Sequence, residues 1–284
     1  MRVAILGCGY VGLELGRQLT DAGHDVVGVR RSDAGLAAIE AVGFEAVGAD
    51  LTDAKSLAAV PDADWVVYAA SAGGRGVDAA RTAYVDGLRT VVEAFGARES
   101  PPDRLVYTSS TGVYGDHDGD WVDESTTPDP TTDRQRVLVE AERIALEETA
   151  AHGISGTVVR FGGLYGPERY RLDRYLDGPV TEGYLNSIHR DDAAGVVAHV
   201  LTADVARGEV VLAVDDEPVS KWEFADWLAE QCGVSPPKKW TVAERAAATE
   251  GAVNRRARVN KRCANDYLHE LGYECRYPTF REGY

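Results

Sequence analysis

Three glycines near the start of the chain have the spacing of a loop that can hold a pyrophosphate. The hexapeptide GCGYVG follows a short apolar run at residues 2–6 and opens an amphipathic run at residues 11–22. In this setting Gly7 permits a tight turn, Gly9 lets the backbone approach a pyrophosphate, and Gly12 lets a helix pack close to a strand. The free N–H groups at the helix start attract phosphates. The predicted cofactor contacts of this loop are Gly7, Gly9, Tyr10, Val11 and Gly12.

The residues after the second predicted strand select among dinucleotides. NAD sites place Asp or Glu here to bind the ribose 2′-hydroxyl. This chain has Arg30, Arg31 and Ser32 instead. Two guanidinium groups and a hydroxyl suit a 2′-phosphate, because arginine binds phosphate oxygens in a bidentate fork. We therefore predict NADP in preference to NAD, and FAD is less favoured because its sites also use the acidic residue. An exposed arginine pair in a turn is the alternative without a ligand.

Two further strand ends carry candidate cofactor contacts. Asp50 and Leu51 follow the third predicted strand, where Asp50 could bind the adenine amino group and Leu51 could cover its face. Ala69, Ala70 and Ser71 follow the fourth, where they could line the adenosine ribose and the pyrophosphate. Each segment could equally be an ordinary loop. The prediction depends on their position at the carboxyl ends of parallel strands, where such sheets bind ligands.

Strands and helices alternate through the first half of the chain. Helical periodicity separates apolar runs at 2–6, 25–29, 44–47, 65–69, 104–108 and 156–160. Such βαβ units predict a parallel sheet with helices on both faces. We expect an α/β fold with a doubly wound (Rossmann) sheet at residues 1–161, to which 186–216 return. Residues 162–185 and 217–284 are predicted to form a small C-terminal substrate lobe.

Several later segments resemble one family. The stretch LVYTSSTGVYG at 105–115 resembles the extended short-chain dehydrogenase/reductase superfamily, the NAD(P)-dependent sugar epimerases and dehydratases. The segments RFGGLYGP at 160–167 and NSIHRDD at 186–192 resemble its later signatures, in the same order. The glycine loop departs from the commoner GxxGxxG of that family. The resemblance covers nearly the whole chain and adds Phe161 and Gly162 to the expected cofactor contacts.

The resemblance implies a catalytic hydroxyl, a Tyr and a Lys four residues after the Tyr. Ser110 occupies the hydroxyl position, but the Tyr and Lys positions hold Thr132 and Arg136. These two residues share a helical face, yet threonine is no general base at neutral pH and arginine keeps its proton. Arg136 could still bind the nicotinamide ribose. The chain has no lysine between Lys55 and Lys221, so no shift of the alignment restores the pair.

Other residues are candidates for the missing roles. Tyr114 lies one turn beyond Ser110 and is a candidate proton donor, with a packed aromatic as its alternative. Tyr165 is expected to shape the substrate pocket. His189 is a candidate substrate contact, although its place before a helix also suits a capping segment. His117, between two aspartates, is interpreted as a solvated loop residue.

Composition narrows the class of partner. The 284 residues include 46 acidic and 30 basic ones, a net charge of −16, which argues against nucleic acid and anionic membranes. The four cysteines form no CxxC pair, so we expect no metal site, reduced thiols and a cytoplasmic location. No apolar run approaches the ~20 residues of a membrane span. Lysine is scarce, as in acidic proteins of halophilic organisms or under a GC-rich genome.

Different classes of function remain open at this stage. The first is an NADP-dependent oxidoreductase or epimerase-like enzyme with a non-standard proton donor. It would act on a carbonyl, sugar or nucleotide-sugar substrate, and a nucleotide-sugar isomerase without net redox is a variant of it. The second is a non-catalytic NADP-binding sensor or regulatory protein. In every case the expected ligand is a small molecule, and a homodimer is the candidate assembly.

Overall fold

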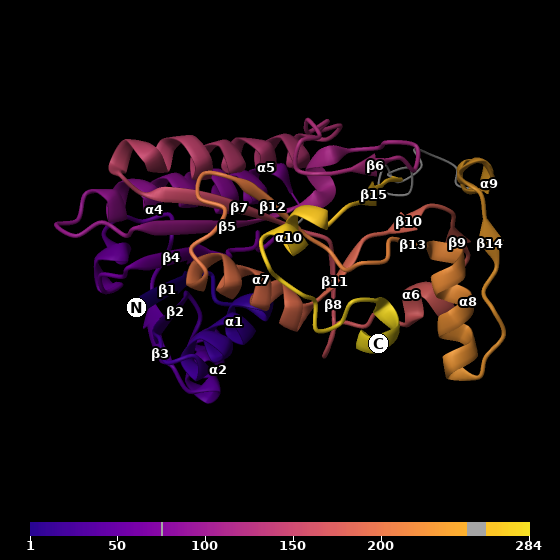
Figure 1. Ribbon diagram of the computed structural model, residues 1–284, viewed down its shortest axis with the longest axis horizontal. Helices are drawn as coiled ribbons and strands as arrows, with labels where there is room; N and C mark the ends of the chain where they lie inside the picture. Colours follow the sequence, from indigo (N-terminus) through magenta and orange to yellow (C-terminus); the bar gives the residue numbers. More distant parts are fainter. Residues whose placement is uncertain (75, 249–259) are drawn as a thin grey trace.

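The computed structural model describes residues 1–74, 76–248 and 260–284, and within these ranges seven parallel strands form the central sheet (Figure 1). Their order is β12-β7-β5-β4-β1-β2-β3. The chain adds β2 and β3 on one side of β1 and then β4 and the later strands on its other side, so the order of addition reverses beside β1. This reversal is the place where doubly wound sheets bind ligands. The strands are β1 (Arg2–Leu6), β2 (Asp25–Arg30), β3 (Glu45–Gly48), β4 (Trp65–Tyr68), β5 (Arg104–Ser110), β7 (Ser155–Phe161) and β12 (Val210–Ala213). The predicted Rossmann sheet is confirmed.

Helices cover both faces of the sheet (Figure 1). One face carries α1 (Tyr10–Asp21), α2 (Asp33–Val42) and α7 (Arg190–Thr202), and the other carries α3 (Val77–Arg81), α4 (Gly87–Gly96) and α5 (Asp133–Arg143). Alternate strand residues point to the two faces, so Val3 and Ile5 join one apolar core while Ala4 and Leu6 join the other. None of the helices in the described part of the chain has the length and apolar character of a membrane-spanning helix.

Three of the helical connections between strands contain turns that are not α-helical. The connection before β5 contains a π-helical turn at Thr82–Asp86 between α3 and α4. The helix of α5 continues through a second π-helical turn, Ile144–Glu148, and a 3₁₀ turn, Thr149–His152. The connection between β3 and β4 forms only a 3₁₀ turn, Ser56–Ala59. Pro61 disfavours helical backbone in the residue before it, and Val60 is extended with a ψ of 124°, so a longer helix does not form here.

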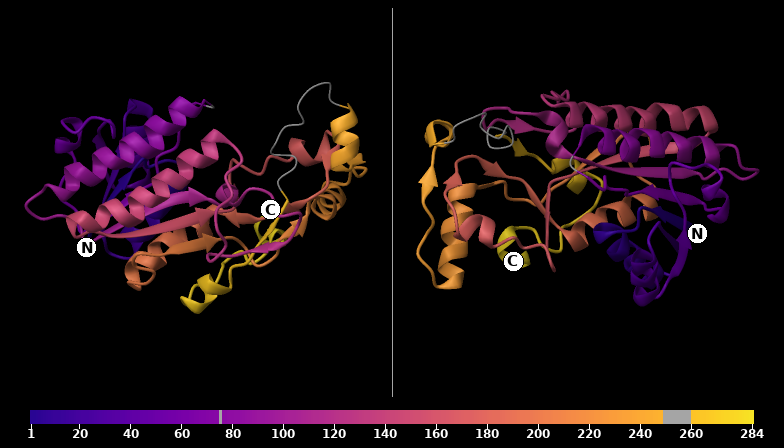
Figure 2. Two further views of the ribbon diagram at one scale, coloured as in Figure 1. Left: turned by 90° about the horizontal axis from the view of Figure 1, so that it is seen from above. Right: turned by 180° about the vertical axis from the view of Figure 1, so that it is seen from behind.

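A small lobe lies at one end of the molecule (Figure 2). It is built from α6 (Asp173–Leu176), α8 (Lys221–Cys232), α9 (Val242–Ala248) and the short strands β9 (Val180–Thr181), β10 (Tyr184–Leu185), β13 (Val219–Ser220) and β14 (Lys239–Trp240). Tyr175, Phe224 and Phe280 are buried in its core. Parallel strands β8 (Gly163–Tyr165) and β11 (Ser187–His189) lie between the lobe and the sheet.

The C-terminal segment returns from the lobe to the sheet. It contains β15 (Arg262–Cys263), which pairs with β6 (Trp121–Val122), followed by α10 (Asp266–Glu270) and α11 (Phe280–Gly283). Leu268 joins the apolar core that α1 and α7 share. A Cβ on Gly195 would lie 2.2 Å from the Tyr273 hydroxyl, so the tail packs directly on α7. The predicted assignment of all of 217–284 to the lobe therefore differs here, because the outer face of α7 is apolar and needs a cover.

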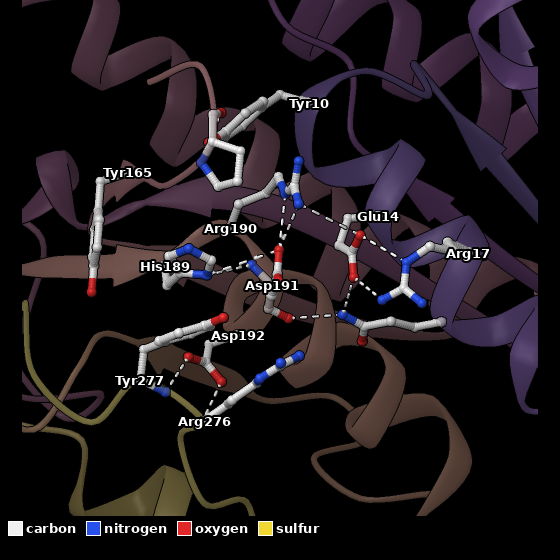
Figure 3. Close-up of polar contacts among 12 residues, drawn as sticks. Tyr10, Glu14, Arg17, Tyr165, His189, Arg190, Asp191, Asp192, Arg276 and Tyr277 are labelled. Atoms are coloured by element: carbon white, nitrogen blue, oxygen red, sulfur yellow. Dashed lines mark hydrogen bonds and ion pairs between the residues drawn. The ribbon is translucent and has the colours of Figure 1, made fainter. Parts of the chain in front are cut away.

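Asp192 fastens this tail to α7. Its carboxylate is 1% exposed and accepts the backbone N–H groups of Arg276 and Tyr277 at 2.7 and 2.9 Å (Figure 3). The Tyr273 hydroxyl donates a third hydrogen bond at 3.0 Å. A buried carboxylate is tolerated when its oxygens are satisfied in this way. The tail is therefore bound by specific polar contacts as well as by burial.

Candidate functional site

The glycine loop is closed by a backbone contact with the end of β4. Gly7 has a φ of +81°, and a Cβ there would lie 2.4 Å from the Ala70 Cα. A Cβ on Gly12, in the first turn of α1, would lie 3.1 Å from Ile5 Cγ2 in β1. Both glycines therefore have the close approaches that a dinucleotide-binding loop uses.

Replacing Gly7 with alanine tests this closure, and Gly23→Ala is its matched control. Gly23 has a similar φ of +85° but open space around its Cβ position. We expect Gly23→Ala to cost about 1 kcal/mol of unfolding free energy, which is the backbone penalty alone. Gly7→Ala must also displace Ala70, so urea unfolding should show a larger loss of unfolding free energy than in Gly23→Ala. NADPH titration should in addition show at least ~10-fold weaker binding. Equal losses in the two variants would contradict the closure.

The start of α1 presents positive potential beside this loop. In the described structure no side chain caps the N-terminus of α1, so the N–H groups from Tyr10 and Val11 onward are available to an anion. A Cβ on Gly9 would lie 2.8 Å from Arg30 Nη1, which places that guanidinium against the loop. Arg30 donates to the Cys8 carbonyl at 3.4 Å and forms no ion pair with a described carboxylate. The loop and Arg30 together therefore suit phosphate groups.

A cavity of about 510 Å³ opens at the carboxyl ends of β1 to β4. Its volume lies in the range of small-molecule sites. Eight of the predicted cofactor residues line it: Gly7, Arg30, Arg31, Ser32, Asp50, Leu51, Ala70 and Ser71. The other predicted residues of this region, Gly9, Tyr10, Val11, Gly12 and Ala69, lie outside the cavity wall, on the loop, on α1 and after β4.

Two polar side chains of this cavity are held in place locally. Hydrogen bonds from the Thr52 N–H and hydroxyl, at 3.0 and 2.8 Å, keep the pKa of Asp50 below its usual range. The other Asp50 oxygen lies 3.5 Å from Arg31, whose side chain is 69% exposed. Ser32 caps α2 by accepting the Gly35 N–H. The cavity therefore presents an ionised carboxylate acceptor beside arginine donors.

A second cavity, of about 220 Å³, follows β5 and β7. Its wall contains Ser109, Ser110, Phe161, Gly162, Gly163, Leu164, Arg169 and Arg171. Ser110 Oγ accepts the Gly112 N–H at 3.1 Å, and no described residue accepts the hydroxyl proton of Ser110. That proton is therefore free for a ligand oxygen. Across the described ranges, no group of three His, Cys, Asp or Glu side chains could hold a metal ion.

Comparison with known proteins agrees with this geometry. The model of the NAD dependent epimerase/dehydratase family matches residues 3–209. The chain belongs to this family. It is 28% identical to Protein YeeZ of Escherichia coli K12 over 288 positions, which cover 98% of this chain and 96% of YeeZ.

Solved structures extend this comparison. A functionally unknown conserved protein from Silicibacter pomeroyi is 29% identical, with a TM-score of 0.78, and covers 99% of this chain and 96% of its own. The human epimerase family protein SDR39U1, solved with NADPH, is 18% identical, with a TM-score of 0.75, and covers 100% of this chain and 97% of its own. This last likeness shows the fold alone.

The Tyr and Lys positions of the epimerase/dehydratase pattern hold structural side chains here. Thr132 caps α5 by accepting the Gln135 N–H at 3.2 Å, and Gln135 accepts the Thr132 N–H in return. Arg136 is 58% exposed and pairs with Asp133 at 2.7 Å. Both residues lie outside the two cavity walls. A helix cap and a surface ion pair are structural roles, so neither residue is proposed to be catalytic.

Tyr114 is part of a buried network. Its side chain is fully buried, and its hydroxyl donates to the Asp123 carbonyl at 2.6 Å and accepts from Arg160 at 2.7 Å. Burial raises the pKa of Tyr114 above its ordinary value. These contacts favour the packing alternative over the proton-donor role. Arg160 in turn forms a bidentate pair with Glu142, at 3.0 and 2.7 Å.

Tyr165 and His189 meet each other beneath the C-terminal tail. Their ring centroids are 5.3 Å apart, Tyr165 stacks on Tyr284, and His189 contacts Tyr277 at 3.9 Å between ring centroids. Figure 3 shows His189 Nδ1 accepting the Asp191 N–H at 3.2 Å, which caps α7. Burial lowers the pKa of His189. Both side chains lie outside the cavity walls, so the structure gives them packing and capping contacts where substrate contacts were expected.

Sequence reasoning missed Arg169 and Arg171 in the second cavity. Arg169 is held over the ring of Tyr10, with its guanidinium carbon 4.5 Å from the ring centroid. The Tyr10 hydroxyl donates to the Pro167 carbonyl at 3.0 Å, which fixes the same loop. The signal available was an arginine- and tyrosine-rich stretch after the YGP motif. That composition does not reveal which arginine faces a cavity. The wall of the first cavity also contains residues that the sequence did not single out, among them Thr52, Gly73 and Thr82.

Proposed function

We propose that this protein is an NADP-dependent oxidoreductase or epimerase-like enzyme acting on a carbonyl, sugar or nucleotide-sugar substrate. The observation that carries the proposal is the wall of the 510 Å³ cavity, where Arg30, Arg31 and Ser32 stand in place of the acidic residue of NAD sites. The cavity is continuous with a loop on which Cβ atoms at Gly7 and Gly9 would collide with their neighbours. These features fit a dinucleotide with a 2′-phosphate.

Each part of the cofactor has residues suited to it. The loop and α1 N–H groups at Gly9, Tyr10 and Val11 would bind the pyrophosphate. Asp50 and Leu51 would bind adenine. Phe161 and Gly162 would support the nicotinamide end, and residues 162–185 and 217–248 would provide the substrate lobe. When bound, NADP supplies or accepts the hydride.

Ser110 is the proposed hydrogen-bond donor to the reacting oxygen. A carbonyl that gains a hydride at carbon must also gain a proton at oxygen. The Ser110 hydroxyl is oriented by the Gly112 N–H, lies in the cavity wall and has a free proton. A serine hydroxyl is too weak an acid to ionise at neutral pH, so water must replace any proton it passes on.

Ser110→Ala tests the proposal. The wild-type protein should bind NADPH and oxidise it with members of a panel of carbonyl and nucleotide-sugar compounds. In Ser110→Ala, kcat should fall roughly 10²- to 10⁴-fold, as for loss of a proton-transfer group, while NADPH affinity stays unchanged. Ser125→Ala, in the exposed loop after β6, is the control and should retain full activity. An unchanged kcat in Ser110→Ala would contradict the role of Ser110.

A non-catalytic NADP-binding sensor is the second candidate function. The capping role of Thr132 and the surface ion pair of Arg136 favour it, because no Tyr and Lys stand in the positions where this family carries its catalytic pair. A sensor would bind NADPH tightly and oxidise none of it across the same panel. Any turnover that Ser110→Ala abolishes would exclude this candidate.

A further inference from the structure

Positive charge without carboxylate partners gathers beside the Ser110 cavity. The protein has a net charge of −16, yet Arg169, Arg171 and Arg174 form no ion pair with any carboxylate in the described ranges. Arg169 and Arg171 are in the cavity wall together with Ser110. In so acidic a chain, arginines are easily neutralised by neighbouring carboxylates. Their unpaired state around one small cavity therefore points to a ligand of opposite charge.

The loop that carries these arginines is held in an unfavourable backbone conformation. Glu168 has a φ of +64° and Arg171 a φ of +55°, both in the left-handed region that suits glycine. The contacts of Tyr10 with Arg169 and with the Pro167 carbonyl fix the loop from the cofactor side. Strained backbone of this kind clusters at ligand sites, where the surroundings maintain it. The loop therefore presents its arginines in a defined arrangement.

Further cations extend this region away from the cavity. Arg174 lies one turn beyond Arg171, whose carbonyl accepts the Arg174 N–H at 3.1 Å. Burial, followed by the positive charge of Arg174, lowers the pKa of Lys221 to about 8. The Lys221 ammonium donates to the Glu182 carbonyl at 3.4 Å, and the buried Lys261 ammonium donates to the Gly115 carbonyl at 3.3 Å. The positive charge therefore extends from the Arg171 loop towards the lobe, where the carboxylate of Asp116 offsets part of it at both lysines and that of Glu182 at Lys221.

We propose that the substrate carries a carboxylate or phosphate group that binds between Arg169 and Arg171, next to the oxygen that Ser110 contacts. This inference rests on the proposed function, since it places the charged group relative to the reacting carbon. The cavity of about 220 Å³ is below the usual range for drug-sized ligands, and Phe161 and Gly162 in its wall would also contact the nicotinamide. The substrate is therefore small, such as a short oxo or hydroxy acid or a small phosphate ester. Arginine binds either anion in a bidentate manner.

Anion titration tests the site without turnover. Oxalate and inorganic phosphate are titrated calorimetrically into the whole protein, with and without NADP. We expect Arg171→Gln and Arg169→Gln each to weaken the better-bound anion roughly 10- to 100-fold. Arg143→Gln, which removes an exposed arginine on α5, should leave the affinity unchanged. Tighter oxalate indicates a carboxylate, and tighter phosphate a phosphate ester. Absent binding in the wild type, or equal affinity in all variants, would overturn the proposal.

Substrate preference provides the second test. NADPH oxidation is measured with 2-oxobutanoate and with its neutral amide, and with glyceraldehyde 3-phosphate and glyceraldehyde. The charged member of at least one pair should have a kcat/KM at least tenfold higher, and Arg171→Gln should bring that ratio close to one. Turnover of the neutral members alone would overturn the anion site. Failure to bind NADPH would instead overturn the proposed function, because the oxalate and phosphate titrations do not need the cofactor.

Discussion

Arg30→Asp should weaken NADP binding roughly 100-fold and change NAD binding far less. The guanidinium lies against Gly9 and lines the 510 Å³ cavity, so the substitution removes a charged donor to the 2′-phosphate and adds a repelling carboxylate. NAD has a hydroxyl in that position, and aspartate is the residue that NAD sites use to bind it. Isothermal titration with both dinucleotides measures the two affinities.

The control for this experiment is Arg143→Asp. It makes the same change of charge on an exposed position of α5, so it reports the general effect of a more negative protein. NADP affinity should remain within about twofold of the wild-type value, because the salt screens distant charges. Equal losses of NADP and NAD in Arg30→Asp would contradict the assignment of the 2′-phosphate site.

Glu142→Gln should cost about 3–5 kcal/mol of unfolding free energy. Glu142 and Arg160 are each about 5% exposed and form a bidentate pair, and Ser109 donates to the same carboxylate at 2.6 Å. Neutralising Glu142 leaves the guanidinium buried without a compensating charge. Arg160 also holds the Tyr114 hydroxyl, so the change should loosen the strand ends beside Ser110. Urea unfolding followed by circular dichroism measures the loss.

Glu140→Gln, on the same helix, is the matched control. Glu140 also forms a bidentate pair, with Arg81 at 3.1 and 2.8 Å, but these two side chains are 31% and 48% exposed. Water and salt screen such a pair, so its loss should cost less than about 1 kcal/mol. Similar losses of unfolding free energy in the two variants would contradict the prediction that burial makes the Glu142–Arg160 pair more important for stability.

The parts of the fold with regular periodicity could be predicted from the sequence. Apolar runs separated by helical patterns determine parallel strands, because a right-handed crossover leaves few other arrangements. The glycine loop could also be assigned, since each glycine has a separate steric reason, and Gly7 indeed lies against Ala70. The residues after successive strands converge on one cavity for the same topological reason.

Contacts between irregular segments could not be predicted. Arg171 reaches the Ser110 cavity through a loop in which two residues other than glycine, Glu168 and Arg171 itself, have positive φ values. Tyr114 is buried because Arg160, on a different strand, binds its hydroxyl. Thr132 is the first residue of a capping box. The family resemblance places it at the position of a catalytic tyrosine, which draws attention away from this capping role. For Arg171 and Tyr114 the role depends on residues distant in the sequence, whereas the role of Thr132 depends on Gln135, three residues further on.

The contacts of the tail with α7 set an order for biosynthesis. The ribosome makes α7 well before residues 273–277, which supply the partners of Asp192 and cover Gly195. Until those residues emerge, a carboxylate destined for burial has no donors and an apolar helix face has no cover. Domains often fold while the chain is still being made. The hydrogen bonds of Asp192 and the cover over Gly195 can therefore form only after Tyr277 has been made, so a nascent chain stalled in the lobe would expose the α7 face and the Asp192 carboxylate.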